Sequence, residues 1–118
     1  MKLGNIHHVS LDVRRLDEAS TFYRDVLGLE EIERPDLGFP GLWLRAGAQQ
    51  IHLMQAEDAA APASQHFAFH VDDLDTAVAE LQSRGVRVSA PRSIPGGGRQ
   101  SFLRDPSGNL IELNEPSE

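Results

Sequence analysis

The feature of this sequence that most restricts its fold is an internal repeat. Residues 6–27 align with residues 64–85, and the alignment resumes near the end of each half of the chain. The pairs that fix the spacing are His8 with His66, 58 positions apart (66 − 8), and His52 with Glu112, 60 positions apart (112 − 52). A self-similar period of this length indicates two copies of one supersecondary unit.

Each copy predicts the element order β-α-β-β-β. Apolar and polar residues alternate first along 8–13 and again along 66–71, which predicts strands with one buried face. A helix follows in each copy, and we expect Asp17 and Asp75 to be the N-caps and Gly28 and Gly85 to end the helices. Three shorter strands then complete each copy, at 30–34, 42–46 and 50–55, and at 87–90, 100–104 and 110–114.

The predicted domain organisation follows from the repeat. Module one covers residues 5–55, an Ala-rich linker covers 56–64, and module two covers 65–115. Because the linker is too short to separate independent domains, and 118 residues suit one domain of ordinary size, we expect a single domain over residues 1–118. The fold class is α+β.

Composition excludes several functions. The net charge of −7 opposes binding to nucleic acid and to anionic membranes, and no apolar run approaches a membrane span. The chain has no cysteine, so it has neither disulfides nor thiolate ligands, and any metal must be held by nitrogen and oxygen. We therefore expect a cytoplasmic protein whose partner is a small molecule.

Four potential metal ligands occupy equivalent positions in the two copies: His8, His52, His66 and Glu112. Two copies related by an approximate twofold axis would bring them toward one point. Three imidazoles and one carboxylate suit a divalent ion such as Zn, Ni, Fe, Co or Mn, and on an octahedral ion they leave two positions for substrate. Such an ion acidifies the C–H next to a coordinated carbonyl, and Glu112 is the candidate general base.

Three further side chains are candidates for substrate binding. His70 shares the strand face of His66 and is expected to orient a ligand or to contact substrate. Trp43 either forms a wall of the cavity or packs between helix and sheet. Arg99 follows Pro95-Gly96-Gly97-Gly98, which is either a mobile lid that carries an anion-binding arginine or an ordinary hairpin tip.

The sequence also resembles a known family. The resemblance rests on five segments of the sequence: HHVSLDV, LDEASTFYRDVLGLE, IHLMQ, QHFAFHVDDLDTAVAEL and FLRDPSGNLIELNEP. They are similar to the vicinal-oxygen-chelate superfamily, which includes glyoxalase I, methylmalonyl-CoA epimerase, extradiol dioxygenases and bleomycin-resistance proteins. The resemblance implies paired βαβββ modules that form an incomplete, strongly curved barrel with helices outside, around a divalent metal. It also implies a homodimer.

By position, the resemblance assigns the metal ligands to His8, His52, His66 and Glu112. Glyoxalase I usually has Glu, and the epimerase Gln, at the second of these positions, so His52 departs from both. We predict a metal-dependent, glyoxalase-like lyase or isomerase that transfers a proton in a small α-oxo carbonyl compound or in its adduct with a thiol such as glutathione. The alternatives are an Fe(II) extradiol-type dioxygenase with His8, His66 and Glu112 as ligands, and a non-catalytic protein that binds an antibiotic or metabolite.

Overall fold

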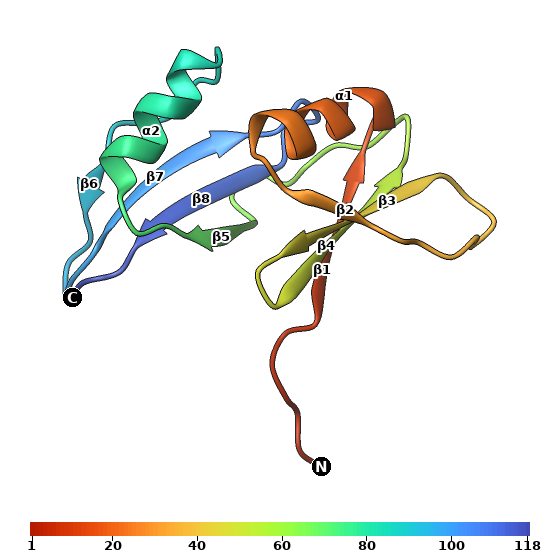
Figure 1. Ribbon diagram of the computed structural model, residues 1–118, viewed down its shortest axis with the longest axis horizontal. Helices are drawn as coiled ribbons and strands as arrows, with labels where there is room; N and C mark the ends of the chain where they lie inside the picture. Colours follow the sequence, from red (N-terminus) through yellow and green to blue (C-terminus); the bar gives the residue numbers. More distant parts are fainter. The chain divides into compact units, whose positions relative to one another are not determined.

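The computed structural model describes residues 1–118, and its backbone divides into two units, Met1–Ala60 and Ala61–Glu118. The first unit contains β1 (His8–Val13), α1 (Leu16–Ser20), η1 (Thr21–Val26), β2 (Glu30–Ile32), β3 (Gly41–Ala46) and β4 (Gln49–Gln55). The second contains β5 (His66–His70), α2 (Leu74–Ser83), β6 (Arg92–Ser93), β7 (Arg99–Arg104) and β8 (Leu110–Glu115) (Figure 1). The α+β class and the βαβββ order of each copy are confirmed.

The two sheets have the same topology. Each is a four-stranded mixed sheet, with the order β1-β4-β3-β2 in the first unit and β5-β8-β7-β6 in the second. The first and last strands of each copy pair in parallel, whereas the other neighbours are antiparallel. Neither sheet closes into a barrel, so each has an open face beside the face that its helix covers.

The strand register repeats as well. On the parallel pair of the first unit, His52 lies opposite Ser10, two residues after His8. On the parallel pair of the second unit, Glu112 lies opposite Ala68, two residues after His66. Because side chains alternate between the two faces of a strand, each copy places its two candidate ligands on the same face of neighbouring strands.

The opposite face of each sheet forms the core. In the first unit this core includes Val13, Tyr23, Leu44, Ile51 and Leu53, all at most 2% exposed. In the second unit it includes Leu74, Val78, Leu103, Ile111 and Leu113. Burying each leucine or isoleucine stabilises the fold by about 1.5–3 kcal/mol. This burial fixes the register, because a slip of one residue would turn the apolar side chains away from the helix.

The predicted N-caps are wrong in both copies. Helix α2 is capped by Asp73, whose carboxylate accepts hydrogen bonds from the backbone nitrogen (3.1 Å) and the hydroxyl (2.8 Å) of Thr76. Asp75 lies within the first helical turn. Helix α1 begins after Arg15, which provides no side-chain cap, and Asp17 lies inside the helix, where it pairs with Arg15 at 2.6 Å. An acidic residue is favourable in either first turn because of the helix dipole.

Helix α1 continues into the π-helix η1, where the hydrogen-bonded rings are wider than in an α-helix. The backbone nitrogen of Leu27 donates to the carbonyl oxygen of Phe22, five residues earlier. Gly28 then ends the segment with φ +78°, and Gly85 follows helix α2 with φ +83°. Both glycines occur where the sequence predicts the helices to end, because residues with a side chain rarely adopt this conformation.

One predicted strand, at residues 87–90, is absent. The short strand β6 forms two residues later, at Arg92–Ser93. Beside β7, the backbone nitrogen of Ser89 donates to the carbonyl of Phe102, but the backbone nitrogen of Phe102 donates to the Ser89 hydroxyl. A side chain thus takes the place of a backbone carbonyl, which stops a regular ladder from forming. No helix has the length and apolar character that crossing a membrane would require.

Candidate metal and substrate site

The clearest pair of functional side chains lies on β5 and β8. Nε2 of His66 is 3.1 Å from Oε1 of Glu112, and Nδ1 of the same ring lies 2.9 Å from the carbonyl oxygen of Ser64. Since a carbonyl only accepts hydrogen bonds, Nδ1 carries the proton and donates it. The 3.1 Å contact with the Glu112 carboxylate is a hydrogen bond when Nε2 also carries a proton, and a bound cation would take the place of that proton.

The surroundings of this pair restrict both side chains. Asn114 donates from Nδ2 to Oε2 of Glu112 at 2.9 Å, and the edge of the Phe102 ring meets the His66 ring at a centroid distance of 5.4 Å. The Glu112 side chain is 10% exposed and that of His66 35%. Both side chains are therefore oriented by neighbouring groups; Glu112 is buried and the side chain of His66 is partly exposed.

The corresponding pair in the first unit is arranged differently. The His52 ring lies between two other rings, with the Trp43 centroid 4.0 Å away at 3° and the His8 centroid 4.0 Å away at 15°. His52 is 7% exposed, and its Nε2 lies 2.8 Å from the side-chain oxygen of Gln50, to which it donates. The three stacked rings line the open face of the sheet. Trp43 is thus on the ligand side and does not pack between helix and sheet.

Burial lowers the pKa of His52 below its ordinary value, and the positive potential of His8, His7 and Arg34 lowers it further. His52 is therefore neutral at pH 7, as a metal ligand or a stacking ring needs to be.

The donor chemistry fits a divalent ion, most directly at His66 and Glu112. Nitrogen and oxygen ligands at about 2.0–2.2 Å on neighbouring corners of an octahedron are separated by about 3 Å, which matches the distance in this pair. In the first unit the ring planes of His8 and His52 are nearly parallel, so their lone pairs do not converge, and His52 would have to leave Gln50 to bind an ion. No group of three His, Asp or Glu side chains suited to a metal is gathered in the structure.

Two of the predicted substrate contacts lie on a different part of the second unit. His70 is exposed at the end of β5, 3.4 Å from Asp72. It borders an open hollow of about 680 Å³ that Arg99 and Glu115 also line. Neither His66 nor Glu112 lines this hollow, so the structure does not bring His70 and Arg99 to the candidate metal ligands.

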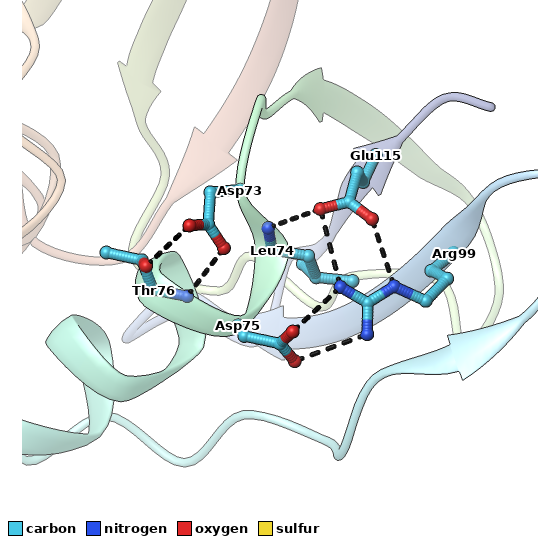
Figure 2. Close-up of polar contacts among 6 residues, drawn as sticks. All are labelled: Asp73, Leu74, Asp75, Thr76, Arg99 and Glu115. Atoms are coloured by element: carbon cyan, nitrogen blue, oxygen red, sulfur yellow. Dashed lines mark hydrogen bonds and ion pairs between the residues drawn. The ribbon is translucent and has the colours of Figure 1, made fainter. Parts of the chain in front are cut away.

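Arg99 is bound within its own unit and is not a free cation. Its guanidinium donates to Glu115 at 3.0 Å and to both carboxylate oxygens of Asp75, at 3.2 and 3.0 Å, while the backbone nitrogen of Leu74 donates to Glu115 at 2.8 Å (Figure 2). Arg99 and the Leu74 N–H lower the pKa of Glu115, and Glu115 and Asp75 raise the pKa of Arg99. Two carboxylates around one guanidinium leave no positive charge for a substrate anion.

The predicted glycine lid is a turn. Gly96, Gly97 and Gly98 form the tip of the hairpin between β6 and β7, where the backbone nitrogen of Ile94 donates to the carbonyl of Gly98. A Cβ at Gly98 would lie 2.8 Å from the carbonyl oxygen of Glu115, so this position requires glycine for space as well as for its φ of +83°. The structure thus favours the hairpin-tip alternative.

One arginine that the sequence patterns do not single out has an unusual environment in the structure. Nε and Nη2 of Arg34 are buried and have no hydrogen-bond partner. Arg34 follows β2 in a segment without periodicity, so no spacing signal identifies it. Its proximity to a glycine on the next strand is visible only in three dimensions.

The comparisons with known proteins agree with this fold. Residues 5–113 match the model of the Glyoxalase/Bleomycin resistance protein/Dioxygenase superfamily. The chain is 32% identical to Glyoxylase I 4 of Arabidopsis thaliana, over 96% of this chain and 71% of the relative. Among solved structures it is similar to TnmS3, an antibiotic binding protein from Streptomyces sp. CB03234, with 30% identity, a TM-score of 0.85 and 99% of both chains covered.

A second solved structure, lactoylglutathione lyase from Agrobacterium tumefaciens, is 28% identical with a TM-score of 0.79, over 98% of this chain and 96% of that one. The resemblance found in the sequence motifs is thereby confirmed over almost the whole chain. The protein belongs to the Glyoxalase/Bleomycin resistance protein/Dioxygenase superfamily.

Proposed function

We propose that this protein is a metal-dependent, glyoxalase-like lyase or isomerase that acts on a small α-oxo carbonyl compound or on its thiol adduct. The observation that carries the proposal is the pairing of His66 and Glu112 at 3.1 Å, with the Nδ1 proton of His66 donated to Ser64 and the second Glu112 oxygen held by Asn114. The similarity to Glyoxylase I 4 and to lactoylglutathione lyase supports the same class.

In this proposal the metal is held by His66 and Glu112 from the second unit and by His8 and His52 from the first. When bound, a divalent ion would supply a positive charge that acidifies the C–H beside the substrate carbonyl. His66 presents Nε2 to the ion because Ser64 retains the proton on Nδ1. The stacked rings of Trp43, His52 and His8 offer a flat apolar surface for the carbon skeleton.

Glu112 is the residue that moves the proton. Its Oε1 lies beside His66, and its Oε2 accepts only from Asn114 among the side chains around it. A carboxylate that shifts away from the ion frees an oxygen to take the proton from one carbon and return it to the next. Because Asn114 donates to Oε2, it orients the carboxylate while Oε1 is the oxygen that is released to take the proton.

The other parts of the proposal concern the state of the protein. Both modules with their linker act as one domain, and two chains form a homodimer, as is typical of short glyoxalase-like proteins. The absence of cysteine suits the reducing cytoplasm.

The Glu112→Gln variant tests this function. Proton transfer is followed by NMR, as deuterium incorporation next to the carbonyl of methylglyoxal, with and without glutathione, in protein reconstituted with each candidate metal. We expect Glu112→Gln to lose turnover and to keep its fold, whereas Glu57→Gln, at an exposed position, keeps both. An active Glu112→Gln enzyme would remove Glu112 from the reaction.

A second candidate function is non-catalytic binding of an aromatic antibiotic or metabolite. The specific observation in its favour is the ring stack, in which His52 is packed between Trp43 and His8 and bonded to Gln50 instead of pointing at an ion site. The similarity to the antibiotic binding protein TnmS3 points the same way. Metal analysis distinguishes the two functions: less than about a tenth of an equivalent of metal after reconstitution would favour binding alone.

The dioxygenase alternative is tested by counting how many side chains of the protein bind the metal. If His52→Ala leaves metal affinity unchanged while His66→Ala abolishes it, His52 is not a ligand. The remaining set of two histidines and one carboxylate is then the one that Fe(II) oxygenases use. A loss of affinity in both variants supports the four-ligand site.

A further inference from the structure

Arg34 is held in the first unit without a carboxylate partner. Other arginines of this unit pair with acids: Arg15 with Asp17, Arg24 with Glu31 and Arg45 with Glu30. In contrast, Nε and Nη2 of Arg34 are buried and make no hydrogen bond. Two charged N–H groups that are shielded from water and unpaired are unfavourable, so an anionic group that satisfies them would bind there with a clear gain.

Two neighbouring residues determine the position of the Arg34 guanidinium. A Cβ at Gly41 would lie 2.7 Å from Nη2 and 2.8 Å from Cζ of Arg34, so the absence of a side chain at Gly41 lets the guanidinium lie against β3. On another side, Cζ lies 4.9 Å from the centroid of the Phe39 ring, a cation–π contact. Shape and an aromatic face thus position Arg34, and no acid neutralises it.

This position is on the same face of the sheet as the candidate site. Side chains two residues apart on a strand share a face, so the space above Gly41, which Arg34 fills, is on the face of Trp43. Trp43 in turn lies opposite His52 in the β3–β4 register and stacks on its ring.

The two unpartnered nitrogens define the ligand. Nε and Nη2 form one edge of the guanidinium, with two roughly parallel N–H groups whose spacing matches the two oxygens of a carboxylate. In a protein with a net charge of −7, an unpaired arginine edge beside the stacked rings gives a local attraction for an anion that the rest of the surface repels.

We propose that Arg34 binds a carboxylate of the substrate, which would be an α-oxo or α-hydroxy carbonyl compound with a separate carboxylate group. This inference rests on the proposed function, because it places the carboxylate beside the surface formed by Trp43 and His52. Because this edge is buried in the free protein, the carboxylate would have to displace the groups that cover it, and Phe39, which lies over the guanidinium and is 44% exposed, is a neighbour with room to move.

The test uses full-length protein freed of metal with EDTA, so that it does not depend on the metal site. The Arg34 Nε–H signal is followed by NMR during titration with glutarate and with its neutral analogue glutaramide. We expect the Arg34 Nε–H signal to shift saturably with glutarate and not to shift with glutaramide. We also expect Arg34→Lys, which keeps the charge and loses the paired N–H edge, to weaken glutarate binding by at least about tenfold. Arg24→Lys, at an exposed ion pair, is the matched control and should bind as the parent protein does.

Two results would overturn the proposal: an Arg34 Nε–H signal that does not move with glutarate, and equal shifts with glutarate and glutaramide. The signal of the parent protein is sufficient for this decision even if Arg34→Lys does not fold. Tighter binding of methyl phosphate than of glutarate would overturn the assignment to a carboxylate. A separate metal titration reports on the proposed function, so a protein that binds metal without a glutarate response refutes this inference alone.

Discussion

Nε2 of His66 and Oε1 of Glu112 lie 3.1 Å apart on neighbouring parallel strands. The second nitrogen of the imidazole and the second oxygen of the carboxylate each make a hydrogen bond to another residue. The imidazole is oriented by the Ser64 carbonyl and the carboxylate by the Asn114 amide. Outer hydrogen bonds of this kind fix the direction of metal ligands and tune their basicity.

We predict that Asn114→Leu weakens metal binding by about 10–100-fold, because the carboxylate of Glu112 loses the donor that orients it. The affinity is measured by competition with a chelator. Gln82→Leu, at an exposed position of α2, should bind metal like the parent protein. Unchanged affinity in Asn114→Leu would contradict a ligand role for Glu112.

The pH dependence of His52 gives a second prediction. The pKa of this ring is lowered in the folded metal-free protein, chiefly by burial, so its NMR titration should have a midpoint below about 6.5. As pH falls, His52 is therefore protonated at a higher pH in the unfolded chain than in the folded protein. The stability that neutral His52 contributes is therefore complete above about pH 6.5 and is lost progressively below it.

The check is the slope of unfolding free energy against pH between about 7 and 5. His52→Gln should flatten this slope because glutamine does not titrate. A His52 midpoint at or above the value for a free histidine would refute the burial argument.

The helix cap gives a third prediction. Asp73→Ala removes both acceptors for Thr76 at the start of α2 and should lower the melting temperature by about 3–6 °C. Asp72→Ala is the matched control, since Asp72 is adjacent in sequence and its side chain is fully exposed. Circular dichroism melts of the two variants make the comparison, and equal melting temperatures would exclude a capping role.

The core gives a fourth prediction. Leu44 is fully buried on β3, and Leu44→Ala should reduce the free energy of unfolding by about 2–5 kcal/mol through lost burial and the cavity that remains. Leu37→Ala, at a position that is 48% exposed, should cost less than about 0.5 kcal/mol. Urea titrations of both variants test the assignment of the core face.

The repeat predicts the same topology for both units, and the alternation of apolar and polar residues along a strand restricts which side chains can face the helix. Once the apolar residues of β1 face the helix, His8 must face away from it, and the same holds for His66 on β5. Strand alternation is therefore sufficient to predict that His8 and His66 point away from the helix, and the offsets of 58 and 60 residues identify the equivalent positions in the two copies. The meeting of all four donors at one ion remains a prediction, because it depends on the packing of one unit against the other.

Other features depend on contacts that no local pattern encodes. Asp75 has the sequence signature of a cap, yet it pairs with Arg99 from a distant strand, and the capping role falls to Asp73, two residues earlier. Arg34 is similar, because its importance depends on the missing side chain of Gly41 across a loop. In both cases a tertiary contact decides the role of a residue that the local sequence leaves ambiguous.

The π-helix η1 records a difference in length between the two copies. Tyr23 and Leu81 are aligned and buried, but five positions separate Tyr23 from Gly28, whereas four separate Leu81 from Gly85. The wider ring that ends at Leu27 absorbs this additional residue within a single turn. An insertion in β4 would have reversed the orientation of every side chain beyond it, including His52. The π-helix thus accommodates the extra residue of the first copy without changing the direction in which His8 and His52 point from their strands.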